Sequence, residues 1–105
     1  FTVLFATNSS AIDSENGKVI VDAASGFAKA KAKAIVLSGH TDAVGNNAAN
    51  VALSERRADT VKAALIDLGV PASAISTTYA GEAQLKVKVP TAEKQNRRVE
   101  IKLSR

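Results

Sequence analysis

Opposite charges stand near the two ends of residues 38–58, and together they could hold a zwitterion. Asp42 can accept hydrogen bonds from an ammonium group, and Arg57 can bind a carboxylate through the planar fork of its guanidinium. Asn50, Ser54 and Arg57 are spaced at i, i+4 and i+7, so a helix would carry all three on one face. These residue types predict recognition of a small molecule that bears both charges.

A strand and a long helix must position these residues. Residues 34–37 form an apolar, β-branched run that is broken at Gly39, which predicts a buried strand ending in a turn. Residues 48–68 carry apolar residues at helical spacing and are followed by a glycine, which predicts a helix. Thr41 and Asp42 then lie just beyond the carboxyl end of the strand, where ligands of α/β sheets commonly bind.

The other elements continue this alternation. Residues 2–5 and 99–103 are β-prone runs, and in the second one apolar residues alternate with charged ones. Residues 15–31 carry one apolar stripe, which predicts an amphipathic helix. Residues 74–80 alternate well enough for a strand, whereas residues 85–89 run straight into a proline, which predicts a loop or an edge strand.

The order of these elements, β-α-β-α-β-β, predicts an α/β fold of the α+β two-layer sandwich type. Two long helices would cover one face of a mixed four-stranded sheet, and the charged positions of the last strand would face water on the other. We expect residues 1–105 to form a single domain, because their number is typical of one.

Composition argues against several classes of site. The chain contains no cysteine, so neither a disulfide framework nor a thiolate metal site is available. The aromatic residues are three Phe and one Tyr, too few for stacking platforms that bind bases or sugars. No apolar run approaches the ~20 residues that span a bilayer, and we expect no signal peptide within these residues. Because the sequence starts at Phe1 rather than Met, we expect a processed product or an excised domain.

The charge is modestly basic. A formal net charge of +4 and a pI near 9.6 suit an anionic partner. Nucleic acid, an acidic cell-wall polymer and an anionic lipid surface all agree with this charge, which does not distinguish between them.

A set of residues at fixed gaps is spread over nearly the whole chain. These positions are Gly39-His40-Thr41-Asp42, Gly45, Asn50, Leu53-Ser54, Arg57-Ala58, Val61, Leu65, Gly81-Glu82 and Gln95-Asn96-Arg97-Arg98-Val99-Glu100-Ile101. In this set the chain resembles the OmpA-like peptidoglycan-binding domain, which ends outer-membrane porins and occurs in envelope lipoproteins and flagellar stator proteins. The number of matching residues makes this resemblance more specific than one short motif.

The resemblance implies a module at the periplasmic face of the cell envelope that holds the wall non-covalently. Its partner would be peptidoglycan, recognised through the diaminopimelate residue of the stem peptide. Asp42 and Arg57 match the acid and the base that clasp the ligand's amine and carboxylate. Four further positions match polar residues that support or border the ligand pocket: Asn50, Thr41, Asn8 and Arg97.

The same resemblance implies what the domain does not need. We expect no catalysis, no cofactor, no metal and no nucleic-acid partner. The domain itself would not insert into a membrane, whereas the parent protein would be anchored in the outer or the inner membrane. A homo-oligomer is left open.

Two alternative chemistries start from the same stretch. His40 and Asp42 at i, i+2 could begin a metal site, but the chain has no second histidine and no cysteine to complete it. A cell-wall hydrolase could use Asp42 as base and Ser54 as nucleophile, but Ser54 lies within the predicted helix rather than on a strained elbow. Asp42 and Arg57 could also form a purely structural salt bridge.

Nucleic-acid or other anion binding is the remaining alternative, suggested by Arg97-Arg98. Successive strand residues point to opposite faces, so these two cannot form one patch. We expect Arg98 to join Glu100 and Lys102 on the solvated face of the sheet. A nucleic-acid binder would lose affinity linearly with the logarithm of salt concentration, whereas competition by free diaminopimelate would favour the cell-wall interpretation.

Overall fold

Helices and strands alternate along the chain in the computed structural model, which describes residues 1–81, 83, 88 and 93–104. Within this part of the chain the long elements are β1 (Thr2–Leu4), α1 (Ser14–Lys29), β2 (Ala34–His40), α2 (Asn47–Asp67), β3 (Ile75–Gly81) and β4 (Arg98–Ser104). Two short 3-10 helices, η1 (Ala72–Ala74) and η2 (Lys94–Asn96), precede β3 and β4. The predicted order β-α-β-α-β-β is therefore confirmed.

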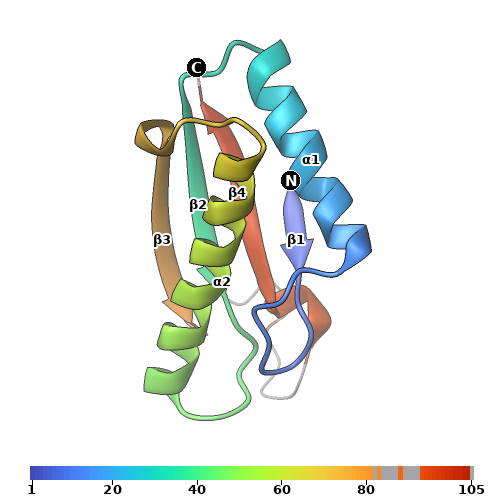
Figure 1. Cartoon of the computed structure of the whole chain (residues 1–105). Coiled ribbons are helices and arrows are strands. Elements are labelled where there is room, and N and C mark those ends of the chain that lie inside the picture. The colour runs from blue at the N-terminus through green and yellow to red at the C-terminus, as the bar shows by residue number, and fades with distance from the viewer. Residues whose placement is uncertain (82, 84–87, 89–92, 105) are drawn as a thin grey trace.

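The strands form one mixed sheet in the order β1-β4-β2-β3. β2 and β3 run parallel, as expected for strands joined by the long crossover through α2, while β4 is antiparallel to both β1 and β2. Both α1 and α2 lie on the same face of this sheet (Figure 1). The predicted two-layer α+β sandwich is confirmed.

The apolar core lies between the helices and the sheet. Val61 and Leu65 of α2 are fully buried, as expected from their helical spacing. In β4, Val99 and Ile101 are buried while Glu100 and Lys102 are exposed, as the alternation predicted. The remaining members of this core are Val3, Phe5, Ile20, Ala23, Ile35, Leu37, Val70 and Ile75.

Arg98 lies on the face that the alternation predicts but is not exposed there. We expected it on the solvated face with Glu100, but only 5% of Arg98 is exposed. Its Nε lies 3.3 Å from Oε1 of Glu100, so the two side chains share a face and their charges compensate. The expectation of a solvated Arg98 is wrong because the alternation of β4 decides which face a side chain takes but not whether that face is covered there.

Gly39 has a different role from the one predicted. β2 continues through Gly39 to His40, so the glycine does not end the strand. A Cβ at this position would overlap the backbone carbonyl of Ser54 and lie 3.3 Å from Cβ of Ala58. The missing side chain therefore lets α2 lie directly on β2, which brings the polar face of the helix to the end of the strand.

Helix α1 ends two residues before the predicted boundary, in a Schellman motif. Lys31 adopts a φ of 52°, its N–H donates to Ala28 O at 3.2 Å, and the N–H of Ala32 donates to Phe27 O at 3.1 Å. Glycine usually takes this left-handed position. A lysine there gave no sequence signal for the end of the helix.

The loop or edge strand expected at residues 85–89 lies outside the described residues, apart from residue 88.

Among the helices of the described part, none has the sustained apolar length that a membrane span requires.

Gly39→Ala tests the close approach of α2 to β2. We expect the substitution to lower the free energy of unfolding by about 1–3 kcal/mol, because the new methyl group meets backbone rather than a movable side chain. Urea denaturation measures the loss. Gly17→Ala in α1 is the matched control: its Cβ would have only Ile12 nearby, at 3.9 Å, and should stabilise the helix by roughly 0.5–1 kcal/mol. Equal effects of the two substitutions would contradict this role of Gly39.

Candidate functional site

A pocket of about 220 Å³ opens at the end of the sheet where β2 finishes. The loop after β1, the loop after β2 and the first half of α2 meet there, at the lower end of the molecule in Figure 1. The lining residues are Thr7, Asn8, Asp42, Val44, Gly45, Ala49, Asn50, Leu53, Arg56 and Arg57. The structure thus brings four of the predicted site residues to one pocket: Asn8, Asp42, Asn50 and Arg57.

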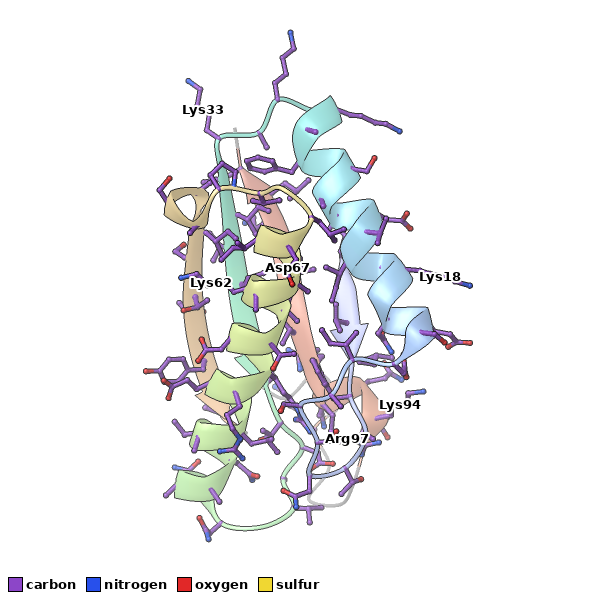
Figure 2. All side chains as sticks on the ribbon, viewed as in Figure 1. Lys18, Lys33, Lys62, Asp67, Lys94 and Arg97 are labelled. Atoms are coloured by element: carbon purple, nitrogen blue, oxygen red, sulfur yellow. The ribbon has the colours of Figure 1, made fainter. Side chains whose placement is uncertain are left out.

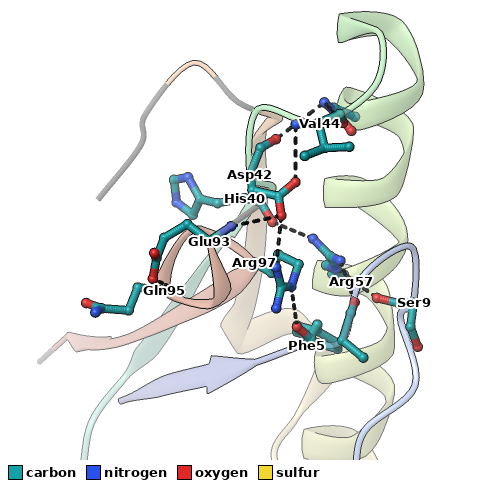
Figure 3. A network of polar contacts seen from close by, with 11 residues as sticks. Phe5, Ser9, His40, Asp42, Val44, Arg57, Glu93, Gln95 and Arg97 are labelled. Atoms are coloured by element: carbon teal, nitrogen blue, oxygen red, sulfur yellow. Dashed lines mark hydrogen bonds and ion pairs between the residues drawn. The ribbon is translucent and has the colours of Figure 1, made fainter. Parts of the chain in front are cut away.

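Asp42 begins the loop that leaves β2, and its carboxylate is already well bonded. Oδ2 accepts from the Arg97 guanidinium at 3.0 Å and from the backbone N–H of Glu93 at 3.3 Å (Figure 3). Among the residues that the structure describes, Oδ1 accepts only from the N–H of Val44, also at 3.3 Å. Because a carboxylate oxygen has two lone pairs, Oδ1 retains the capacity to accept from a ligand.

Arg57 is fully buried, and its guanidinium faces backbone oxygens. Nε donates to Ser9 O at 2.8 Å, one terminal nitrogen to His40 O at 3.0 Å and the other to Ala6 O at 3.1 Å (Figure 3). The guanidinium carbon also lies 5.3 Å from the centre of the Phe5 ring, within the range of a cation–π contact. Arg57 therefore connects α2 to the loop after β1 and to the end of β2.

Burial makes the Arg57 guanidinium easier to deprotonate than a solvated one. Desolvation is the largest cause and lowers the pKa of Arg57 to about 10, with the positive charges of Arg97 and Arg56 acting in the same direction. The negative charge of Asp42 opposes this shift. At neutral pH Arg57 is still a cation.

The two predicted ligand-binding charges do not pair with each other. The ion pair of Asp42 is with Arg97, and the described hydrogen bonds of Arg57 all go to backbone carbonyls. The alternative considered from the sequence, a structural salt bridge between Asp42 and Arg57, is therefore wrong. Both residues nevertheless line the same pocket, so the opposite charges are close without cancelling each other through a direct contact.

Asn50 holds the loop that carries Asp42. Its amide donates to Val44 O at 3.0 Å and to Asp42 O at 3.4 Å, so the side chain fixes the loop from inside the pocket. Asn8 also lines the pocket and has a φ of 51°, a left-handed conformation that asparagine tolerates. Thr41 is buried, and its N–H donates to Gly81 O at 2.8 Å, but it does not line the pocket.

Arg97 lies just before β4, behind Asp42. Its Nε donates to Phe5 O at 2.9 Å, and only 13% of its side chain is exposed. Arg97 does not line the pocket and acts through Asp42, whose charge it compensates. The sequence contained no pairing rule that could have assigned Arg97 to Asp42, 55 residues away.

Ser54 lies on the same face of α2 as Asn50 and Arg57 and has a structural role. Its hydroxyl donates to Val51 O at 2.7 Å and accepts from the N–H of Gly81 at 3.0 Å. These bonds connect α2 to the end of β3. The serine considered as a nucleophile in the hydrolase alternative is thus engaged with backbone groups.

The buried side chain of His40 lies on the other face of the sheet. Gly39 faces α2, so its neighbours Ser38 and His40 face away from the helices. Nε2 of His40 lies 2.8 Å from Ser38 Oγ and 3.7 Å from Glu100 Oε2. Since the hydroxyl and the carboxylate approach the same ring nitrogen, this is not the geometry of a catalytic triad, in which the acid binds the other nitrogen.

His40 and Asp42, weighed as the start of a metal site, bind different partners. In the part of the chain that the structure describes, no group of three or more His, Asp or Glu side chains could hold a metal ion. The pKa of His40 is lowered, first by burial and then by the positive charge of Arg98, while Glu100 acts in the opposite direction.

Comparison with known proteins places the chain in a family. A family model described as the OmpA family matches residues 4–98, most of the chain. The chain belongs to the OmpA family. This confirms the resemblance noted in the sequence.

Individual relatives agree with this assignment. The Escherichia coli K12 protein named "Probable lipoprotein YiaD" is 48% identical over 73 residues, which make up 68% of this chain and 33% of that protein. Among solved structures, the peptidoglycan-associated lipoprotein of Burkholderia pseudomallei shares the fold at a TM-score of 0.86 and 24% identity, over 98% of this chain and 89% of that one. The cell wall anchor of the T6SS from Pseudomonas aeruginosa is 26% identical, with a TM-score of 0.76 over 93% of this chain and 72% of that one.

Arg57→Ala should destabilise this OmpA-family domain severely. It removes three buried hydrogen bonds to backbone carbonyls, which we expect to cost at least about 3 kcal/mol of unfolding free energy. Urea denaturation followed by circular dichroism provides the measurement. Arg56→Ala, one residue away and exposed, should change stability by no more than about 0.5 kcal/mol. If both variants were equally stable, the structural role of Arg57 would be refuted.

His40 should make the domain less stable in mild acid. Its folded-state pKa is below the ordinary value of 6.5, so the unfolded chain binds the proton more readily. Stability is therefore present above about pH 6.5 and is lost as the pH falls, by at most about 1.4 kcal/mol per pH unit. Unfolding free energies at pH 7.5 and pH 5.5 should differ more for the wild type than for His40→Gln. An equal decline in both proteins would contradict the assignment to His40.

Proposed function

We propose that this domain binds peptidoglycan non-covalently through the diaminopimelate residue of the stem peptide. In doing so it tethers the outer membrane or an envelope complex to the cell wall, from the periplasmic face of the envelope. The observation that carries this proposal is the pocket at the end of β2, which Asp42 and Arg57 line together. A carboxylate and a guanidinium in one pocket suit a ligand that bears an ammonium and a carboxylate side by side.

The size of the pocket supports part of a polymer as ligand rather than a whole small molecule. Its volume of about 220 Å³ is below the ~300–1,000 Å³ of sites that enclose drug-sized ligands. It suits a group of the size of one amino-acid side chain. The end of a diaminopimelate side chain, with its ammonium and carboxylate on one carbon, is such a group.

Asp42 and Arg57 both have hydrogen-bonding capacity left for such a ligand. Oδ1 of Asp42 has one long bond, to Val44 N, and can accept from an ammonium group. Arg57 uses three of its five N–H donors on backbone carbonyls, which leaves two for a carboxylate. The N-terminus of α2 adds partial positive charge near Gly45 and Ala49, which line the pocket.

The relatives support a role at the cell wall. The solved proteins of similar fold include one named for its association with peptidoglycan and one described as a cell wall anchor. The chain spans only 33% of the E. coli lipoprotein, so a role in tethering belongs to the longer protein as a whole. We infer that this domain supplies the wall-binding part.

The proposed mechanism is recognition without turnover. Charge-assisted hydrogen bonds contribute about 1.5–3 kcal/mol each, so one stem peptide binds with modest affinity. Firm tethering then comes from many domains that meet a polymeric wall, through multivalency. The Ser38–His40 pair lies on the sheet face away from α2, so it does not act on a ligand held in this pocket.

Asp42→Asn tests the proposal directly. We expect at least a roughly tenfold loss of affinity for a stem peptide containing diaminopimelate, because the ammonium loses its charged acceptor. Isothermal titration calorimetry measures the loss, and circular dichroism establishes that the variant is folded. Asp59→Asn removes the same charge from the exposed side of α2 and should bind like the wild type.

A lysine-containing peptide completes this test. Lysine keeps the ammonium of diaminopimelate but lacks its second carboxylate, so the wild type should bind it more weakly. Undiminished binding by Asp42→Asn would refute the proposed site. Equal affinity for the two peptides would show that the extra carboxylate is not recognised.

A further inference from the structure

Arg56 stands one residue before Arg57 on α2 and lines the same pocket. Its side chain is exposed, in contrast to the fully buried Arg57. Within the described part of the chain, its guanidinium forms no ion pair, not even with its helix neighbours Glu55 and Asp59. All five of its N–H donors are therefore available to a ligand at the pocket.

The described lining of the pocket contains more positive than negative charge. Asp42 is the one carboxylate among the described lining residues, and it is already paired with Arg97. Arg56 and Arg57 add two guanidinium groups to the lining. After burial, which lowers the pKa of Arg57 most, Asp42 raises this pKa, while the positive charges of Arg97 and Arg56 each lower it.

The zwitterionic end of a diaminopimelate side chain cannot balance this excess. Its ammonium and its carboxylate cancel, so the three guanidinium groups would still face a single compensating charge, that of Asp42. A second carboxylate on the ligand would offset part of the remainder. Arg56 is placed to receive it, because the two remaining donors of Arg57 are assigned to the first carboxylate and Arg97 is bonded to Asp42 and Phe5 O.

We propose that Arg56 binds a second carboxylate of the stem peptide, so that the pocket prefers peptides with a free acid in addition to the zwitterionic end of diaminopimelate. This inference rests on the proposed function and deepens it. The substrate class is an anionic peptide rather than a neutral zwitterion. Walls whose stem peptides are amidated would then be bound less well than walls with free acids.

Two peptides and two variants test the role of Arg56. The first peptide is Ala-γ-Glu-diaminopimelate with all carboxylates free, and the second has every carboxylate amidated except the one at the zwitterionic end. We expect the wild type to bind the free-acid peptide about three- to tenfold more tightly in calorimetric titrations at low salt. Arg56→Gln should bind both peptides with the lower affinity.

Lys18→Gln is the matched control. It removes the same charge from an exposed position on α1, where the side chain points outward (Figure 2), and should retain the preference of the wild type. Thermal unfolding of both variants should match the wild type, since both side chains are exposed. Loss of the preference in Lys18→Gln would show that net charge, and not Arg56, creates it.

The outcomes separate this inference from the proposed function. If the wild type binds both peptides equally well, diaminopimelate recognition stands and the role of Arg56 is wrong. If Arg56→Gln weakens binding of both peptides to the same extent, Arg56 does not recognise the second carboxylate. If the wild type binds neither peptide, the proposed function itself fails.

Discussion

The buried guanidinium of Arg57 is the interaction on which this end of the molecule depends. Its three hydrogen bonds reach Ser9 O, Ala6 O and His40 O, which belong to the loop after β1 and to the end of β2. A buried cation is costly unless its donors are satisfied, and here three of them meet backbone carbonyls. One side chain of α2 thus fixes the loop and the strand end that border the pocket.

Other polar side chains of α2 also bind the backbone of neighbouring segments. Asn50 binds the carbonyls of the loop after β2, and Ser54 accepts from the N–H at the end of β3. Gly39 allows the polar face of α2 to lie against the sheet, because a side chain there would collide with Ser54. The pocket is therefore held in place before a ligand arrives, which lowers the entropic cost of binding.

The three arginines at the pocket differ in what compensates their positive charge. Arg97 neutralises Asp42, Arg57 is stabilised by backbone dipoles, and Arg56 is left to the solvent. With this division, the described lining of the pocket carries two guanidinium groups and one carboxylate. The division also makes Arg57 both a structural residue and a candidate ligand contact, so loss of binding in an Arg57 variant cannot be assigned to the ligand contact alone. Asp42 and Arg56 separate the two roles better.

Local patterns determined most of the architecture. The helical spacing in α2 and the alternation in β4 predicted that Val61, Leu65, Val99 and Ile101 enter the core, because these periods follow from backbone geometry alone; Leu68, expected on the same stripe, is exposed because it lies at the end of the helix. The spacing of Asn50, Ser54 and Arg57 likewise placed them on one helix face, and the family pattern marked Asp42 and Arg57 as a pair. Only the tertiary structure decided their partners. Asp42 binds Arg97 rather than Arg57, Gly39 lets α2 approach β2 closely, and Arg98 is buried. Each of these contacts joins segments that are distant in sequence, so no local period encodes them.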